Sequence, residues 1–413
     1  MNRRDLLTYM GAAGAAGLLP NPIASLGSVA HAAVPTKPPK RLIMVMAQGG
    51  WDTTWALDPK VQSARCDVPL GARRMFGNLD VYDHVSRPNV STYFTRHADK
   101  SAIVRGISVS SVSHNECVKR MATGTRSERN PDMGAIVATD NGLALPLPYL
   151  ILGDTAFAGE YAVSAGRVGA TNQIVGLLDS PTTGAEDAIL SHYADATVNR
   201  VKATRGALGY NKRRLSDFST SIERGKKLIP VRAGFGAAGR TLTLANQVDL
   251  AVDAIAGGIS QAVMLNTRLG WDTHDMIGDQ AGFHETTFGA LTTLVDELTA
   301  RPGREAGTKM IDDTVVVCFS EFSRTPKLNA NNGKDHWPVT SAVVIGGGIR
   351  GGRAYGATND GNEAETVNFA TGARSATGMT LMSNHFVAGV LTACGIDPVS
   401  HLGPTEVFNA FVA

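Results

Sequence analysis

The sequence predicts an α/β fold, namely a three-layer α/β/α sandwich built on a mostly parallel sheet. Short runs rich in β-branched residues recur along the 413 residues, each bounded by glycine or polar residues. Stretches with helical periodicity lie between these runs, and this alternation is typical of doubly wound α/β proteins. Hydrophobic residues make up 43% of the chain and charged residues 18%, so the chain is expected to fold around a sizeable core.

Six runs are expected to form strands because they are short and apolar on both sides, as buried parallel strands are. They span residues 41–47, 102–109, 148–153, 261–266, 314–320 and 341–346. Three segments between them, 115–122, 242–257 and 286–299, are expected to be helical. The last of these places its apolar residues on one face, since they recur at the helical period.

Residues 176–235 interrupt this alternation. The segment is polar and locally basic, so we expect a helical insertion or cap whose lysines and arginines form a solvated face. A second interruption, Gly346 to Gly351, matches the spacing of a dinucleotide-binding loop. However, Gly352 and Tyr355 follow where a helix would have to begin, which argues against a nucleotide-binding fold.

The N-terminus predicts export. Arg3 and Arg4 precede a mildly apolar Gly/Ala/Leu run, and Ala30 and Ala32 have the spacing that a signal peptidase recognises. Paired arginines in this position indicate the twin-arginine route. We therefore expect residues 1–33 to be an export signal recognised by the twin-arginine translocase. Residues 34–413 would then form the mature α/β domain, in the periplasm or outside the cell.

Composition and charge exclude two kinds of binding partner from the expectations. The formal net charge is +2 and no block of basic residues occurs, so a nucleic-acid partner is not expected. Beyond the N-terminal segment no stretch of about 18 apolar residues exists, so no membrane span is expected after signal removal. Of the four cysteines, Cys318 lies in an apolar run, where a buried free thiol is expected.

Polar residues follow several predicted strands, at the sheet edge where α/β proteins bind ligands. Asp52 follows the run 41–47. Asp272 and His274 follow the run 261–266, and a carboxylate with an imidazole two residues later suits a metal ion.

The run 314–320 is followed by Glu321 and Arg324. Charges directly after a buried strand are costly unless they coordinate a ligand or pair with each other, and both alternatives stay open. Asp335 and His336, slightly further along, form a second couple of potential metal ligands.

A fourth cluster begins the predicted helix near residue 115. Ser113 is expected to cap this helix, with Glu116 three residues later completing a capping box. Because a helix N-terminus offers free N–H groups, Ser113 and His114 are candidates for holding an oxyanion or supplying a nucleophile.

Four motifs in this order resemble those of an exported bacterial family of unknown function. They read GGWD from Gly49, WDTH from Trp271, SEFSRTP from Ser320 and GKDH from Gly333. The family is grouped with the alkaline-phosphatase and sulfatase-like superfamily. The resemblance therefore implies that residues 34–413 form an alkaline-phosphatase-like α/β/α sandwich with a metal centre at the carboxyl edge of its sheet. It implies metal or catalytic roles for Asp52, for His114 with Ser113 beside it, for Asp272 and His274, for Glu321 and for His336.

Two positions depart from the superfamily's pattern. His114 stands where a serine, a threonine or a modified cysteine is the usual nucleophile, and it could act as a nucleophile, as an acid–base or as a metal ligand. Phe322 stands where a metal-binding histidine is usual. One divalent metal ion, Zn or Mn, is therefore expected rather than two. Its ligands would come from Asp52, Asp272, His274, Glu321, Asp335 and His336.

The first functional hypothesis is an exported metal-dependent hydrolase of phosphate or sulfate esters, acting on a small-molecule or glycan ester. Arg324 and the helix start would hold the anion, and Ser113 or His114 would attack or activate water. The alternative is a catalytically inactive envelope protein, or an anion- or glycan-binding protein, on the same fold. Trp51 and Trp271 lie in the motifs and could stack on sugars or form walls of the site.

Overall fold

The computed structural model describes residues 39–153, 155–168, 184–204, 209–228 and 242–413. The expected export signal therefore lies outside the described residues. Within the compact unit Lys37–Ala413, an eight-stranded sheet has the order β12-β4-β11-β8-β1-β7-β5-β6. The strands are β1 (Arg41–Met46), β4 (Ser101–Ser108), β5 (Tyr149–Ile151), β6 (Ala165–Arg167), β7 (Ala262–Asn266), β8 (Thr314–Phe319), β11 (Val339–Gly346) and β12 (Arg353–Tyr355).

All the paired strands of this sheet are parallel except β11, which runs antiparallel to both β4 and β8. The mostly parallel sheet is thus confirmed, but the expectation that residues 341–346 form a parallel strand is wrong. The reason lies in the connection from β8 to β11. It contains the small antiparallel pair β9 (Ser323–Arg324) and β10 (His336–Trp337), which reverses the chain without a crossover helix.

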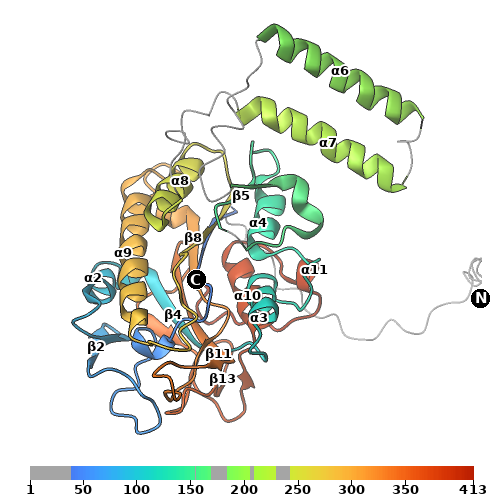
Figure 1. Cartoon of the computed structure of the whole chain (residues 1–413). Helices are drawn as coiled ribbons and strands as arrows, with labels where there is room; N and C mark the ends of the chain where they lie inside the picture. Colours follow the sequence, from blue (N-terminus) through green and yellow to red (C-terminus); the bar gives the residue numbers. More distant parts are fainter. Residues whose placement is uncertain (1–38, 154, 169–183, 205–208, 229–241) are drawn as a thin grey trace, which may run out of the picture. The chain divides into compact units, whose positions relative to one another are not determined.

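Helices cover both faces of the sheet, which confirms the three-layer sandwich (Figure 1). Side chains of β1 alternate between the two cores: Ile43 and Val45 pack on one side, Leu42 and Met44 on the other. One layer contains α2 (Pro88–His97), α8 (Leu244–Ala256) and α9 (Asp279–Ala300), and the other contains α3 (His114–Thr123), α4 (Met133–Gly142) and α10 (Ser383–Ala393).

The predicted helices are all present, with shifted ends. The largest difference is α9, which begins at Asp279 instead of residue 286. In α3, Ser113 occupies the N-cap position, but its side chain makes no capping hydrogen bond, so the predicted capping box is wrong. Glu116 instead accepts from Ser111 Oγ at 3.2 Å and from Arg120 Nη2 at 2.5 Å.

The remaining elements are short or lie in the expected insertion. Two long helices, α6 (Gly184–Ala203) and α7 (Gly209–Leu228), fall within residues 176–235, whose other parts lie partly outside the described residues. The glycine-rich segment from Gly346 is followed by strand β12 and not by a helix, as expected. The short elements are β2 (Ala72–Phe76), β3 (Leu79–Asp83), β13 (Thr366–Val367), β14 (Met379–Thr380) and α11 (Val399–Leu402). No helix in the described part of the chain is both long and apolar enough to cross a membrane.

Candidate metal centre

The carboxyl ends of β1, β7 and β8 bring three loops to one point of the sheet edge, because these strands are parallel neighbours. The loop after β1 passes very close to the other two. Gly50 has a φ of +88°, and a Cβ atom there would lie 2.5 Å from the Phe322 ring. A Cβ atom on Gly49 would lie 2.9 Å from the backbone nitrogen of Asp272. Two glycines are thus required for the loops to meet.

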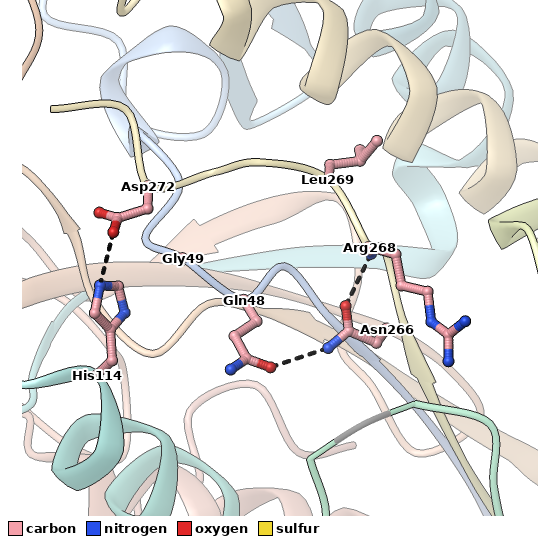
Figure 2. A pocket seen from close by; sticks show the side chains of 7 residues that line it. All are labelled: Gln48, Gly49, His114, Asn266, Arg268, Leu269 and Asp272. Carbon is pink, nitrogen blue, oxygen red and sulfur yellow. Dashed lines mark hydrogen bonds and ion pairs between the residues drawn. The ribbon is translucent and has the colours of Figure 1, made fainter. Parts of the chain in front are cut away.

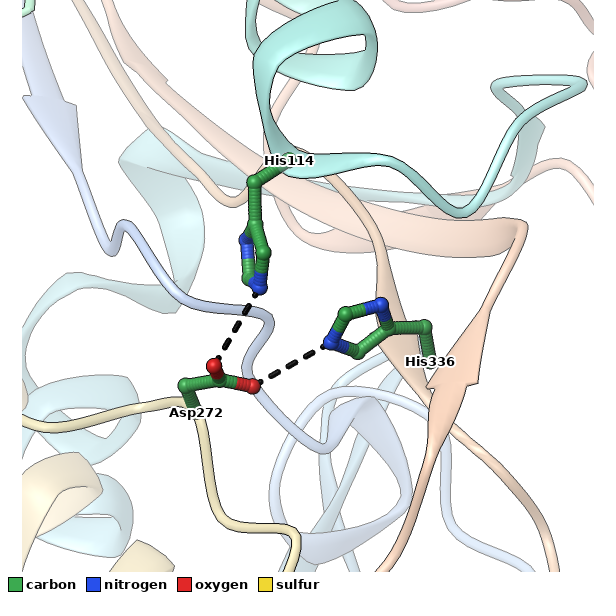
Figure 3. Close-up of side chains that lie close together, drawn as sticks. All are labelled: His114, Asp272 and His336. Atoms are coloured by element: carbon green, nitrogen blue, oxygen red, sulfur yellow. Dashed lines mark hydrogen bonds and ion pairs between the residues drawn. The ribbon is translucent and has the colours of Figure 1, made fainter.

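Three imidazole Nε2 atoms converge on the carboxylate of Asp272 at this point (Figure 3 shows two of them). His336 Nε2 and His274 Nε2 each lie 3.2 Å from Asp272 Oδ1, and His114 Nε2 lies 3.4 Å from Oδ2. His114 comes from the start of α3, His336 from β10, and the other two residues from the loop after β7. The structure therefore gathers four of the sequence-predicted residues from three separate segments.

The opposite ring nitrogen of each histidine contacts an oxygen. His114 Nδ1 lies 2.7 Å from Glu321 Oε1 and His274 Nδ1 lies 2.9 Å from Asp335 Oδ1. His336 Nδ1 lies 2.7 Å from the backbone carbonyl of Val112. A carbonyl and an ionised carboxylate only accept hydrogen bonds, so these contacts assign the proton to Nδ1 and a lone pair to Nε2 in each neutral ring.

These tautomers create a site that a cation fits. His274 Nε2 and His336 Nε2 lie 2.9 Å apart, so two lone pairs face each other. His114 Nε2 is buried and has no hydrogen-bond partner. Ligand atoms of His114, His336 and Asp272 all lie within 4.8 Å of one another, so a metal ion placed among them would satisfy both imidazole nitrogens, with His274 Nε2 as a further donor beside His336. Metal-binding histidines characteristically donate their other N–H to a carboxylate or carbonyl. Three imidazoles and one carboxylate form a donor set that Zn or Mn accepts.

Charged neighbours keep Asp272 ionised. Burial alone would raise its pKa, but the hydrogen bond and the positive charge of the Arg324 guanidinium outweigh burial and lower the pKa to about 2. The hydrogen bond with Glu321 raises the pKa of His114, whereas burial lowers the pKa of His336. The carboxylate thus stays available as a ligand at any pH at which the imidazoles are neutral.

Glu321 and Asp335, both expected as ligands, contact the outer side of the histidines. Glu321 is fully buried and accepts hydrogen bonds from the backbone N–H of Gly49 at 2.8 Å and from Ser320 Oγ at 3.1 Å, besides His114. Asp335 is exposed, and the bonds it makes with His274 and Asn329 lower its pKa. Both carboxylates therefore contact the Nδ1 side of a histidine and not the cluster around Asp272.

The structure does not bring Asp52 into this cluster. Its carboxylate accepts from Thr54 N–H at 3.0 Å and from Lys334 Nζ at 2.6 Å, and both members of this ion pair are fully buried. Asp52 also caps a short 3-10 helix, Thr53–Trp55. The sequence suggested a ligand because Asp52 follows the first strand, but the lysine that neutralises it is distant in sequence and gave no local signal.

Arg324 is committed to protein groups and not to a ligand. Its buried guanidinium donates to the carbonyls of Gly49 and Gly50 and, at 2.6 Å, to Asp272 Oδ1. It also donates to the Lys334 carbonyl at 3.1 Å. The expected contact between Arg324 and a substrate anion would require these bonds to break. Its role here is to join the loops after β1 and β7.

Aromatic residues form walls of the site. The Phe322 ring packs 4.7 Å from the His114 ring and 4.4 Å from the His336 ring, measured between centroids. Trp51 and Trp271 are fully buried and pack edge to face on each other at 6.2 Å, so neither ring is free to stack on a sugar. Ser113 lies beside this site at the N-cap of α3 and is exposed to solvent.

A pocket of about 590 Å³ opens beside the cluster (Figure 2). His114 and Asp272 form one side, and three residues that the sequence analysis did not select, Gln48, Asn266 and Arg268, form the other. They stand at or just after the ends of β1 and β7. The same strand-end reasoning that selected Asp52 could have found them, but single amides and arginines near strand ends are common and gave no distinct signal.

One protein-family model matches part of the chain. Residues 231–400 match the model of a family described as a protein of unknown function (DUF1501). No curated protein matches the chain.

The solved structures that are similar to this chain share little sequence identity with it. A protein in the alkaline phosphatase superfamily from Vibrio parahaemolyticus is 9% identical, covers 88% of this chain and 68% of its own, and gives a TM-score of 0.40. The lipoteichoic acid synthase LtaP from Listeria monocytogenes is 9% identical. The match covers 90% of this chain and 74% of that protein, with a TM-score of 0.38. The C-terminal periplasmic domain of EcEptC from Escherichia coli, in complex with Zn, is 8% identical. The match covers 87% of this chain and 83% of that domain, with a TM-score of 0.38.

Proposed function

We propose that this protein is a metal-dependent hydrolase of phosphate or sulfate esters. The observation that carries the proposal is the convergence of three buried or half-buried imidazole Nε2 atoms on the ionised Asp272, each with its tautomer set from the other side. Four inward-facing donors are costly to assemble without a cation. The four motifs that resemble the sulfatase-like superfamily support the same reaction class.

In this proposal His114, His274, His336 and Asp272 hold one divalent ion. The ion would act as a Lewis acid on the ester and lower the pKa of a water molecule. Water adds to phosphorus or sulfur, the bond to the alcohol oxygen breaks, and the alcohol takes up the proton that the water gives up. Glu321 keeps His114 in the ligating tautomer, and Phe322 excludes water from the faces of two rings.

His114 is assigned to the metal and not to nucleophilic attack, because its Nε2 faces Asp272. Phe322 occupies space between two of the ligands' rings, which supports one metal ion and not two. We further propose that the protein acts after twin-arginine export, outside the cytoplasm, as the N-terminal motif indicates.

The test combines metal content with turnover. Mature protein purified from an exporting host should hold about one Zn or Mn ion per chain by elemental mass spectrometry. Asp272→Ala should lose the metal and the hydrolysis of nitrophenyl esters, while circular dichroism shows a retained fold. Arg353→Gln, an exposed change on edge strand β12, is the matched control and should keep both.

A binding protein with a structural metal is the second candidate. It is favoured by His114, which stands where the superfamily that the motifs resemble usually has a serine, threonine or modified cysteine as the nucleophile. Metal binding without turnover of any sulfate or phosphate ester would support this alternative and contradict the hydrolase.

A further inference from the structure

We propose that the substrate is a sulfate or phosphate ester of an oligosaccharide. The reacting ester would lie beside the metal centre, and the neighbouring sugar ring would occupy a second pocket next to it. This inference rests on the proposed function, because it takes the metal centre as the place where the ester reacts. It is drawn from the side chains that line the second pocket.

The second pocket, which we call the α3 pocket, adjoins the pocket of the metal centre. Its volume is about 380 Å³, and the polar and aromatic side chains that line it include Gln48, Asn115, Thr155 and Phe157. Gln48 also lines the pocket of the metal centre. Asn115 directly follows His114 in α3, so the start of this helix borders both pockets. A substrate that extends from the metal centre past Gln48 would therefore enter the α3 pocket.

Two amide side chains of the α3 pocket have hydrogen-bonding groups that the protein leaves unused. Gln48 Oε1 accepts from Thr155 Oγ1 at 2.8 Å and from Asn266 Nδ2 at 3.1 Å, so its Nε2 group points away from them, toward the His114 side (Figure 2). Within the part of the chain that the structure describes, neither Gln48 Nε2 nor the exposed Asn115 amide has a hydrogen-bond partner. Amides both donate and accept, which matches the hydroxyl groups of a sugar.

The charged side chains that line the α3 pocket pair with each other. Lys119 Nζ lies 3.1 Å from Glu128 Oε2, and the described lining contains no other charged residue. Electrostatics in this pocket therefore gives no preference for a second anionic group. A neutral group whose hydroxyls contact the amides and the ion pair is the better fit.

The α3 pocket also offers an apolar surface. Phe157 is half-buried and lines the pocket together with Val118 and Ala156. The C–H groups on one face of a sugar ring are apolar, so their burial against these side chains is favourable. An acyl chain would use the same surface, but it would cover the Gln48 and Asn115 amides without giving them hydrogen bonds, which is costly. This combination favours a sugar over a lipid.

A series of esters that differ in the number of sugar rings tests the inference. Each member carries the same sulfate or phosphate on the same sugar, so the reactivity of the ester itself is constant. We expect kcat/KM to rise about tenfold or more from the monosaccharide ester to the disaccharide ester. Equal values along the series would overturn this inference while supporting the proposed hydrolase.

The variant Asn115→Ala links this gain to the α3 pocket. It should reduce the ratio of kcat/KM between the disaccharide and the monosaccharide ester about three- to tenfold, since one hydrogen bond is lost. Asn199→Ala, the same change at an exposed position of α6, is the matched control and should leave the ratio as in the wild type. An unchanged ratio in Asn115→Ala would overturn the assignment of the pocket.

A binding measurement separates failure of this inference from failure of the proposed function. The metal-loaded protein is applied to an array of sulfated and phosphorylated oligosaccharides and, in parallel, to vesicles of phosphatidylglycerol. We expect binding to an esterified oligosaccharide, weakened in Asn115→Ala but not in Asn199→Ala. Binding without turnover of any ester would support the sugar pocket and contradict the hydrolase. Binding to no oligosaccharide, or tighter binding to the vesicles, would overturn this inference even if nitrophenyl esters were hydrolysed.

Discussion

At the scale of single residues, the buried Glu321 carboxylate sets the tautomer of the His114 imidazole. It is fully buried, and its acceptor positions are taken by Gly49, Ser320 and His114. In Glu321→Gln an amide N–H group would take the place of one carboxylate oxygen. If this N–H faces His114, Nδ1 must accept the hydrogen bond, and the proton of the imidazole moves to Nε2. We expect metal affinity to fall about 10- to 100-fold, as for other changes of groups that support a ligand. Chelator competition measures this fall. Glu116→Gln, on the same helix as His114, is the control, and an unchanged affinity in Glu321→Gln would contradict the assigned role.

Asp52 is predicted to stabilise the fold without binding metal. Asp52→Asn would leave the buried Lys334 ammonium without its partner, and breaking such a pair typically costs about 3–5 kcal/mol. Chemical denaturation should show this loss, while metal content stays at the wild-type value. Replacing both partners, as in Asp52→Asn with Lys334→Met, should recover part of the stability. Loss of metal at unchanged stability would instead identify Asp52 as a ligand.

At the scale of elements, the loop after β1 fits between its neighbours only because it carries glycines. Gly50→Ala would force a Cβ atom to within 2.5 Å of the Phe322 ring at a φ of +88°. We expect a loss of stability of about 2 kcal/mol or more, from backbone strain and overpacking together.

The helix α9 offers a control for this substitution. Gly282 lies inside α9, and a Cβ atom there would meet nothing within 4 Å. Gly282→Ala should therefore stabilise the protein, by about 0.5–1 kcal/mol, through helix propensity and lower chain entropy. Thermal unfolding of both variants provides the measurement. Equal effects at the two positions would show that the loop tolerates a side chain.

The beginning of α9 also shows why its start was not predicted. The apolar stripe that indicated the helix begins near Phe288, whereas its first turns bury polar side chains. Gln280 accepts from Asp52 N–H at 2.9 Å and donates to the Trp271 carbonyl at 3.0 Å, and His284 Nε2 donates to the Asp52 carbonyl at 3.1 Å. Polar residues that serve loops distant in sequence look like a solvent-exposed segment when only hydrophobicity is read.

At the scale of the whole molecule, His284 links folding stability to pH. Burial and the nearby charge of Arg87 lower its pKa to about 3, whereas an unfolded histidine titrates near its ordinary value of ~6.5. Between these two pKa values, the imidazole therefore binds a proton in the unfolded chain but not in the folded protein. Stability is fully present above this ordinary value and is lost as the pH falls toward 3, by up to about 1.4 kcal/mol per pH unit.

The variant His284→Gln keeps a donor for the Asp52 carbonyl but cannot titrate. We expect its free energy of unfolding to depend less on pH than that of the wild type in this window, and urea titrations at several pH values measure the difference. Parallel pH curves for the two proteins would exclude His284 as the source of the acid sensitivity.

Export is a property of the whole chain that residues 1–33 are predicted to confer. The double variant Arg3→Lys with Arg4→Lys keeps the charge but removes the paired arginines that the twin-arginine translocase recognises. We expect the precursor to accumulate in the cytoplasm, which fractionation with an antibody against the mature protein would detect. Unchanged delivery to the periplasm would instead indicate the general secretory route.

The sequence by itself determined the sheet and its layers, because buried strands and amphipathic helices are encoded by local hydrophobic pattern. It also placed the chemistry at the sheet edge, since Asp272, His274 and His336 follow strands or stand close to them. Only the tertiary structure decided which of these groups meet around Asp272. The distinction depends on which oxygen reaches each Nδ1 and on the lysine that neutralises Asp52. These partners come from residues distant in sequence, so no local pattern could reveal them.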